Sequence, residues 1–135
     1  PFNHFYCYIN IPDTSDRDSL FQAEVRRCKI FLDNIKESTP DTRHFCIFDE
    51  LFSGTNPYEA VASAYGYLSY LNKNKNIKFM LTTHYLDLCK EFDKDLKCIK
   101  NYNTENKYHI GEGISTVKGG IKILHELIPT IILYQ

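Results

Sequence analysis

The sequence predicts an α/β domain built on a parallel sheet. Three observations lead to this fold class. Short apolar runs occur at residues 5–9, 45–48 and 77–81, stretches with helical periodicity separate them, and the length of 135 residues suits one domain. Strand, helix and strand in units of this length imply a right-handed crossover, which makes neighbouring strands parallel. The carboxyl ends of such strands form the edge where open α/β sheets bind ligands.

The first part of the chain contains a strand and a long helix. Residues 5–9 are aromatic and β-branched and run into a polar turn, as expected of a strand. Apolar side chains recur at helical spacing through residues 19–37, and either Asp18 or Ser19 suits the N-cap of this helix. Pro40 restricts the residue before it, so the helix is expected to end upstream of this proline.

The middle of the chain contains a second strand and a second helix. The continuous apolar run at residues 45–48 is typical of a strand buried on both faces, and Asp49 and Glu50 end it. After a short loop, Asn56 is expected to cap the next helix, with Pro57 at its first position. An Asn/Lys-rich stretch, which we interpret as a solvated loop, ends this helix.

The last part of the chain begins with a third apolar strand at residues 77–81, which leads to His84 at its tip. Beyond it the pattern is weaker and predicts shorter elements. These are a helix near residues 85–90, strands near 96–103 and 107–110, and a helix that begins near Gly119 and Gly120.

Composition excludes several classes of protein. The 16 Lys and Arg residues oppose 17 Asp and Glu residues, so the basic excess of a direct nucleic-acid-binding domain is absent. No apolar run approaches the roughly 20 residues of a membrane span, and no signal-peptide pattern opens the chain. We therefore expect an intracellular protein with no membrane partner. The five cysteines are odd in number and lack a C-x-x-C pair, which favours reduced, mostly buried thiols.

Asp49 and Glu50 are the first candidate site residues, because both follow directly on an apolar strand. In a site for a metal-bound nucleotide, the first carboxylate of such a pair holds Mg²⁺, often through water, and the second orients an attacking water molecule. A simpler explanation also exists, since many strands end in an acidic residue that only solvates the sheet edge. The pair alone leaves both interpretations open.

His84 and Ser19 add to the first interpretation. A neutral imidazole beside a carboxylate hydrogen-bonds a phosphate oxygen or the water being activated, although a single histidine is often only a structural side chain. Ser19 places a hydroxyl at the start of a long helix, where free N–H groups and the helix dipole favour anions. An ordinary helix cap also explains this serine. Together the two strand tips indicate a sensor of the terminal phosphate of a nucleotide.

Three stretches follow one another along the chain: DRDSLFQAEVRRCKIFLD, FCIFDELFSGTNPYEAVASAYGYLSYL and FMLTTHYLDL. In the order signature, acidic strand (Walker B) and histidine strand, they resemble the ATPase domain of MutS-type DNA mismatch repair proteins, which are ABC-class ATPases with a P-loop NTPase core. The stretch YHIGEGISTVKGGIKIL is similar to the closing β-hairpin and glycine-started helix of the family. The stretch YINIPDTSDRDSLFQAE, near the start of the chain, is most similar to a MutS-like branch from large DNA viruses.

The resemblance implies a role for each candidate residue. Asp49 would help to bind Mg²⁺, Glu50 would polarise the hydrolytic water, and His84 would be the switch histidine that senses the γ-phosphate of ATP. Ser19 would belong to the signature element that reaches the nucleotide of the other subunit. The loop along the dimer interface, beside the two nucleotide sites, would contain Gly54, Thr55 and Asn56.

The chain departs from the family in two respects. No G-x-x-x-x-G-K-[ST] motif occurs, so the Walker A loop that cradles the phosphates is missing. We therefore expect residues 1–135 to be the C-terminal part of a MutS-type ATPase domain, inactive alone, with the Walker A portion upstream in the complete protein. In the signature, Leu20 stands where the family usually has Thr, and Gln22 where it often has Met.

For the complete protein, the resemblance implies a Mg²⁺-dependent ATPase that couples ATP binding and hydrolysis to recognition of mismatched or distorted DNA. It would act as a dimer with a second MutS-type subunit and would contact DNA mainly through other domains. One alternative is a MutS-like ATPase that acts on recombination or branched DNA. The other is a catalytically inactive dimerisation module, against which the intact Asp49, Glu50 and His84 argue.

Overall fold

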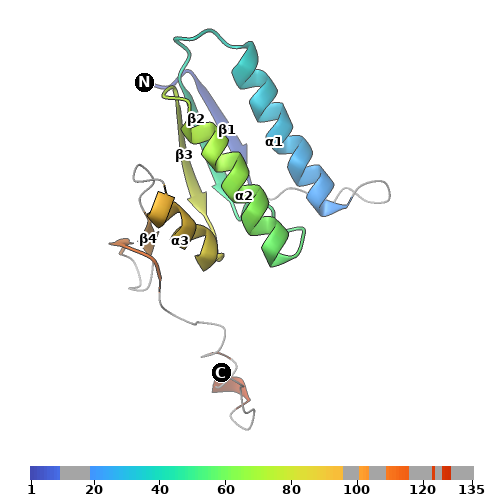
Figure 1. Cartoon of the computed structure of the whole chain (residues 1–135), viewed down its shortest axis with the longest axis vertical. Coiled ribbons are helices and arrows are strands. Elements are labelled where there is room, and N and C mark those ends of the chain that lie inside the picture. The colour runs from blue at the N-terminus through green and yellow to red at the C-terminus, as the bar shows by residue number, and fades with distance from the viewer. Residues whose placement is uncertain (10–18, 96–100, 104–108, 116–122, 124–125, 129–135) are drawn as a thin grey trace.

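The computed structural model contains a three-stranded parallel sheet with β2 at its centre (Figure 1). The strands β1 (His4–Tyr8), β2 (His44–Asp49) and β3 (Ile77–Thr82) lie in the order β1-β2-β3. The predicted α/β class with a parallel sheet is confirmed. The residues that the structure describes are 1–9, 19–95, 101–103, 109–115, 123 and 126–128.

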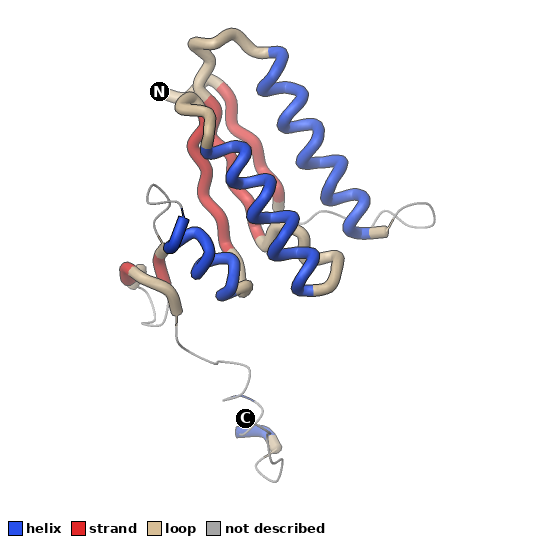
Figure 2. The backbone as a smooth tube through the Cα atoms, viewed as in Figure 1, coloured by secondary structure: helices blue, strands red, loops and turns tan. Residues whose placement is uncertain are grey.

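Two helices, α1 (Leu20–Glu37) and α2 (Pro57–Asn72), lie side by side on one face of the sheet (Figure 2). The Tyr67 hydroxyl on α2 donates a hydrogen bond to the Cys28 carbonyl on α1 at 3.2 Å and so joins the two helices. Both helices match the stretches predicted from periodicity. Within the described ranges, no helix is long and apolar enough to cross a membrane.

Side chains start both helices by satisfying free backbone N–H groups. The Ser19 hydroxyl accepts from the N–H of Gln22 at 3.4 Å, and the Gln22 side chain accepts from the N–H of Ser19 at 3.0 Å, which is a capping box. Asn56 accepts from the N–H of Glu59 at 3.1 Å, and Pro57 follows it. Of the two predicted N-cap candidates for α1, Ser19 takes this position, and the N-cap predicted at Asn56 is confirmed. The unusual Gln22 has a structural role.

The core lies between the sheet and these helices, around the central strand. Phe48 on β2 is fully buried, and its ring contacts those of Tyr8, Phe31, Tyr67 and Phe79 with centroids 5.8 to 6.4 Å apart. Tilted and edge-to-face ring contacts of this kind stabilise a fold beyond the burial of apolar area. They hold the end of β2, and therefore the two carboxylates that follow Phe48, in a defined position.

The opposite face of the sheet has no comparable layer in the described part of the chain. Along β2, His44, Cys46 and Phe48 are buried towards the helices, whereas Phe45 and Ile47 on the other face are only half-buried. The prediction that this strand is buried on both faces is therefore wrong for the described residues. The physical reason is that both right-handed crossovers run in the same direction across the sheet, which places both helices on one face.

Beyond β3, the third helix α3 (Leu86–Asp95) packs against α2. The rings of Tyr65 on α2 and Phe92 on α3 stack with their centroids 5.4 Å apart, and Leu88 and Phe92 are buried in the same core. The helix predicted near residues 85–90 is confirmed and extends one further turn. Its position directly after β3 fixes the segment that carries His84.

Two short strands, β4 (Tyr102–Asn103) and β5 (Gly111–Glu112), form an antiparallel pair. The pair confirms a hairpin in this part of the chain. Its first strand falls within the predicted range 96–103, whereas the second begins just after the predicted 107–110. The helix predicted to begin near Gly119 and Gly120 lies outside the described residues.

The described cysteines are free thiols. Cys28 and Cys46 are buried, as predicted, and burial raises the pKa of each thiol to about 12. Cys89 is partly buried. Cys7 is exposed on β1, so the interpretation of the cysteines as buried groups is wrong for this residue, because its side chain lies on the uncovered face of the sheet. Cys98 lies outside the described residues.

Candidate active site

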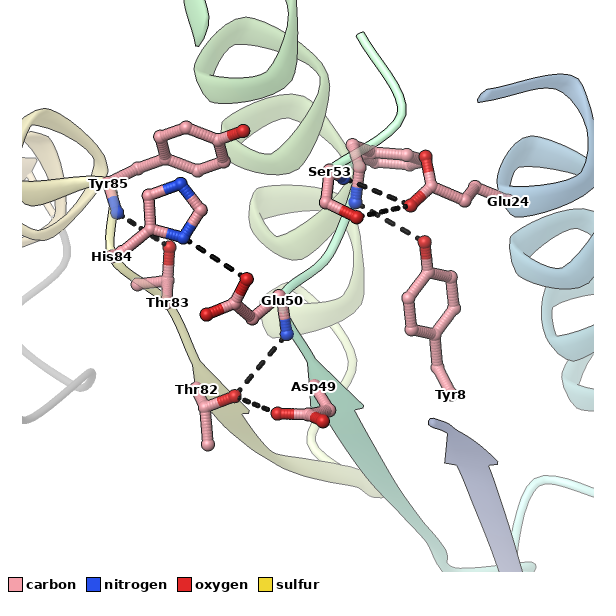
Figure 3. A network of polar contacts seen from close by, with 10 residues as sticks. Tyr8, Glu24, Asp49, Glu50, Ser53, Thr82, Thr83, His84 and Tyr85 are labelled. Carbon is pink, nitrogen blue, oxygen red and sulfur yellow. Dashed lines mark hydrogen bonds and ion pairs between the residues drawn. The ribbon is translucent and has the colours of Figure 1, made fainter. Parts of the chain in front are cut away.

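The ends of β2 and β3 bring the predicted acidic pair and histidine to one edge of the sheet (Figure 3). Asp49 pairs with Thr82 in the register of the two strands, Glu50 follows Asp49, and His84 lies two residues beyond Thr82. The His84 Nδ1 atom lies 3.2 Å from the Glu50 Oε2 atom. The structure thus places Glu50 and His84 in direct contact, beside Asp49, at the edge where parallel sheets bind ligands.

Glu50 has an uncommon backbone conformation. Its φ is 51°, in the left-handed region that non-glycine residues seldom adopt. The Glu50 N–H is held by Thr82, whose carbonyl oxygen accepts at 3.1 Å and whose hydroxyl oxygen accepts at 3.3 Å. The side chains of Glu50 and His84 are 51% and 58% exposed. Glu50 and His84 are thus accessible to solvent, and Thr82 holds the Glu50 backbone in an uncommon conformation. This combination is typical of a functional site.

Thr82 was not predicted as a site residue, yet its hydroxyl connects both carboxylates. It donates a hydrogen bond to Asp49 Oδ1 at 2.5 Å and accepts one from the Glu50 N–H at 3.3 Å. One threonine therefore orients the Asp49 side chain and the Glu50 backbone together. The T-T-H stretch contains this residue, but its partners follow from the strand register, which the sequence pattern does not reveal.

Tyr85 packs on the imidazole of His84, with ring centroids 4.2 Å apart. The Tyr85 N–H donates to the Thr83 hydroxyl at 3.0 Å, which fixes the turn that leads into α3. Burial, and then the negative charges of Glu24 and Glu50, raise the pKa of the Tyr85 phenol. Tyr85 therefore stays uncharged at neutral pH and limits the rotation of His84 without adding charge to the site.

The other predicted nucleotide-binding residues lie near the starts of α1 and α2. Ser19 and Asn56 are exposed and act as helix caps, and the Thr55 hydroxyl donates to the side chain of Glu59 in the first turn of α2 at 2.5 Å. Their hydrogen bonds run within the helix starts and not to Glu50 or His84. The structure therefore does not join them to the Glu50–His84 pair by direct contact.

Glu24, inside the first turns of α1, was also not predicted as a site residue. Its side chain is buried, and it accepts hydrogen bonds from the N–H groups of Ser53 at 3.0 Å and Gly54 at 3.1 Å. A buried carboxylate is unfavourable unless it is hydrogen-bonded, so these bonds tie the loop after β2 to α1. The signature stretch DRDSLFQAEVRRCKIFLD includes this residue, but the sequence alone does not show that its side chain is buried.

Asp49 suits a magnesium ion that arrives with a nucleotide. Asp49 is exposed, and the Thr82 hydroxyl engages only its Oδ1 atom, which leaves Oδ2 for an ion or an ion-bound water. Among the residues that the structure describes, no group of three or more His, Cys, Asp or Glu side chains is arranged to hold a metal. Because Mg²⁺ is usually bound by one or two carboxylates together with waters and substrate phosphates, a single carboxylate fits this ion.

Comparison with known proteins places the chain in a family. The family model described as MutS domain V matches residues 1–130. The chain is similar to the DNA mismatch repair protein MutS of Clostridioides difficile (strain 630), with 32% identity over 76% of this chain, and of Bacteroides fragilis (strain YCH46), with 33% identity over 67%. For MutS of Dehalococcoides mccartyi the identity is 28% over 87% of this chain.

These matches cover only a small part of each relative. They span 10% of the length of the first two proteins and 12% of the third. The family model, in contrast, covers nearly all of this chain, from the strand β1 through the segment beyond β5. The chain therefore belongs to the MutS domain V family, the ATPase domain of MutS proteins.

Proposed function

We propose that this chain carries the water-activating part of an ATPase site in a protein that recognises mismatched or distorted DNA. The observation that supports this proposal is the 3.2 Å contact between Glu50 and His84, beside Asp49. A carboxylate and an imidazole at the ends of adjacent parallel strands are suited to orient the water that attacks a terminal phosphate. Membership of the MutS domain V family supports ATP as the nucleotide.

Each side chain has its own task in this proposal. Asp49 would hold Mg²⁺, directly or through water, and the chemistry that the ion would supply is neutralisation of charge on the phosphates. Glu50 accepts a hydrogen bond from the hydrolytic water and orients it. When a neutral His84 donates from Nδ1 to Glu50, its Nε2 carries no proton. Nε2 donates to a phosphate oxygen only when the ring carries a second proton. In that form His84 is proposed to link the phosphate to Glu50.

The remaining parts of the site belong to other segments of the protein in this proposal. Residues 1–135 contain no G-x-x-x-x-G-K-[ST] motif, so the amides and lysine that cradle the phosphates lie elsewhere. Residues 1–135 would then be the C-terminal part of the ATPase domain of an intracellular protein. The net charge of −1 supports the proposal that the main DNA contacts lie in other domains.

A second MutS-type subunit completes the proposed arrangement. Ser19 and residues 54–56 would meet the nucleotide that this partner holds, and the partner would supply the same residues in return. Because phosphoryl transfer depends on positioning and on charge stabilisation, hydrolysis would then require closure of the dimer. Exposure of Ser19 and Asn56 at neighbouring helix starts supports this role.

The substitution Glu50→Gln in the complete protein tests the proposal. The amide keeps the size of the side chain but is a poor base, so ATP binding is expected to persist while hydrolysis slows at least on the order of a hundredfold. Nucleotide binding is measured by equilibrium titration with ATP and Mg²⁺, and hydrolysis by phosphate release under single-turnover conditions.

The matched control is Glu37→Gln, on the exposed last turn of α1, which is expected to leave both quantities unchanged. Unchanged turnover in Glu50→Gln would remove Glu50 from the mechanism. A complete protein that neither binds nor hydrolyses ATP would instead favour the inactive dimerisation module. Activation by mismatched duplexes, compared with branched DNA, separates the mismatch role from the recombination role.

A further inference from the structure

Glu24 is a buried charged group that the proposed mechanism does not use. Its side chain lies on α1 and the residue is 2% exposed. It accepts three hydrogen bonds, from the Ser53 N–H at 3.0 Å, the Ser53 hydroxyl at 3.2 Å and the Gly54 N–H at 3.1 Å. Figure 3 shows the contact between Ser53 and Glu24. All three donors belong to the loop that follows Glu50. The Tyr8 hydroxyl on β1 also contacts this carboxylate, which helps to raise the pKa of the Tyr8 phenol after the larger effect of burial.

The backbone of that loop depends on side chains from other elements. Glu50 and Phe52 both have left-handed backbones, with φ of 51° and 62°. The Phe52 N–H donates to the Tyr8 hydroxyl at 3.3 Å, and the next two N–H groups donate to Glu24. Successive N–H groups that converge in this way form a concave anion site, which the Glu24 carboxylate fills. The loop is therefore shaped by α1 and β1.

Close packing also joins the loop to the first turn of α1. A Cβ atom added to Gly54 would lie 2.7 Å from the Phe21 backbone nitrogen and 2.8 Å from Leu20 Cγ. Contacts this short leave no room for a side chain at position 54 unless the loop or α1 shifts, so the loop backbone rests directly on the residues that follow Ser19. The start of α1 and the loop after Glu50 therefore lie against each other in addition to being hydrogen-bonded.

We propose that Glu24 is a positioning residue that makes the start of α1 and the loop after Glu50 move as one body. The inference rests on the proposed function, in which Ser19 meets the nucleotide of the partner subunit and Glu50 orients water in its own site. Glu24 lies five residues after Ser19, and its bonds end three and four residues after Glu50. A displacement of Ser19 on dimer closure is thereby transmitted to Glu50.

The alternative is that Glu24 only stabilises the fold. The two roles differ in what they predict for kinetics. If Glu24 is purely structural, its replacement lowers stability and the amount of active protein but leaves the turnover of each folded molecule intact. If Glu24 couples the two segments, its replacement lowers kcat in the folded protein. The size of that fall then depends on whether Ser19 is present, because both residues act on one step.

The test is Glu24→Gln in the complete protein, alone and combined with Ser19→Ala. Glutamine keeps the size of the side chain but replaces one acceptor oxygen with a donor, which faces an N–H group of the loop. Loss of a charged hydrogen bond of this kind is expected to lower kcat about tenfold. The KM for ATP is expected to change less than about twofold, and the two substitutions together are expected to lower kcat less than the product of their separate effects.

A milder variant and a control complete the design. Ser53→Ala removes one of the three donors at a mostly exposed residue, and we expect a smaller fall in kcat with the same dependence on Ser19. If Glu24→Gln does not fold, Ser53→Ala tests whether this hydrogen-bonded contact affects kcat. Glu37→Gln, exposed at the far end of the same helix, is expected to be unchanged in kcat, KM and thermal midpoint.

The outcomes separate this inference from the proposed function. An unmodified protein that does not hydrolyse ATP overturns both. An active unmodified protein with normal kcat in Glu24→Gln overturns the inference alone. The inference is likewise overturned if the effects of Glu24→Gln and Ser19→Ala multiply independently, or if Glu24→Gln lowers only the thermal midpoint. A fall in kcat at nearly constant KM, dependent on Ser19, supports it.

Discussion

At the scale of single residues, Thr82 determines how the candidate active site is arranged. Its hydroxyl lies between the Asp49 carboxylate and the Glu50 N–H. Side chains that orient a metal-binding carboxylate influence ion affinity even though they do not touch the ion. Because Asp49 is exposed, Thr82 is the main restraint on the rotation of its side chain in the described structure.

We expect Thr82→Val to weaken the binding of Mg²⁺ with ATP by about tenfold, because valine keeps the shape of threonine but cannot hydrogen-bond Asp49. Calorimetric titration of Mg²⁺ into the ATP-bound complete protein measures this effect. Thr82→Ser, which retains the hydroxyl, is expected to restore affinity. Thr39→Val, which removes a hydroxyl that contacts Thr42 away from the site, is the control. Equal Mg²⁺ affinity in Thr82→Val would contradict the role of this hydroxyl.

His44 makes the stability of the chain depend on pH. The residue is 2% exposed, and its ring nitrogens contact the Tyr6 hydroxyl at 3.2 Å and the Ser38 hydroxyl at 3.0 Å. Burial, and then the charge of His4, lower the pKa of His44. Below its ordinary value of about 6.5, the unfolded chain therefore binds a proton that the folded chain does not, and acid favours unfolding.

We expect the free energy of unfolding of the 135-residue chain to fall as the pH decreases below about 6.5, by at most about 1.4 kcal/mol per pH unit from this residue. His44→Gln should reduce this slope, while Thr39→Val, which changes no titratable group, should leave it unchanged. Urea unfolding at several pH values between 5 and 8 gives the measurement. Identical slopes in the original chain and His44→Gln would refute the assignment to His44.

At the scale of elements, the contact between the loop after β2 and the start of α1 depends on Gly54. A Cβ at this position would meet backbone and side-chain atoms of α1 at less than 3.0 Å, whereas a Cβ at Gly66 on α2 would meet nothing within 4 Å. The absence of a side chain therefore has a different consequence at each of the two glycines. Gly54 permits a close approach, and Gly66 is an exposed position in a helix interior where glycine lowers stability.

We expect Gly54→Ala to destabilise the chain by about 1–3 kcal/mol through overpacking. The matched substitution Gly66→Ala is expected to stabilise it by roughly 0.5–1 kcal/mol, because alanine loses less conformational freedom in a helix. Both values follow from urea unfolding at neutral pH. A neutral or stabilising Gly54→Ala would show that the loop moves away from α1 without cost.

At the scale of the whole molecule, the sheet face opposite α1 and α2 has no covering layer in the described part of the chain. The register places Phe5 beside Phe45 on this face, and Ile47 between Cys7 and Met80. Phe5 and Met80 are 67% and 61% exposed. Parallel sheets usually have both faces covered, and contiguous exposed apolar groups favour association.

We therefore expect the 135-residue chain by itself to self-associate through this face. Replacing Phe5 and Met80 together by serine is expected to shift the chain towards monomer without changing its far-UV circular dichroism. Sedimentation velocity over a range of concentrations measures the association. Tyr58→Ser, which removes an exposed aromatic side chain from the start of α2, is the control. A monomeric original chain, or equal association in all variants, would contradict this expectation.

Prediction from sequence succeeded where the signal is local. The caps at Ser19 and Asn56 and the ranges of the main strands and helices follow from side chains within one turn or one strand. The contact of Glu50 with His84 could also be anticipated, because adjacent parallel strands end at the same edge. The catalytic and binding roles of these residues stay predictions.

The sequence by itself determined the order of the main strands and helices, the starts of α1 and α2 and the identity of the polar groups at the strand tips, because periodicity and capping act over a few residues. Only the tertiary structure decided that Thr82 orients Asp49, that Glu24 holds the loop after Glu50, and that both helices lie on one face. These contacts join residues about 30 positions apart, and their geometry depends on strand register and crossover direction, which no local pattern encodes.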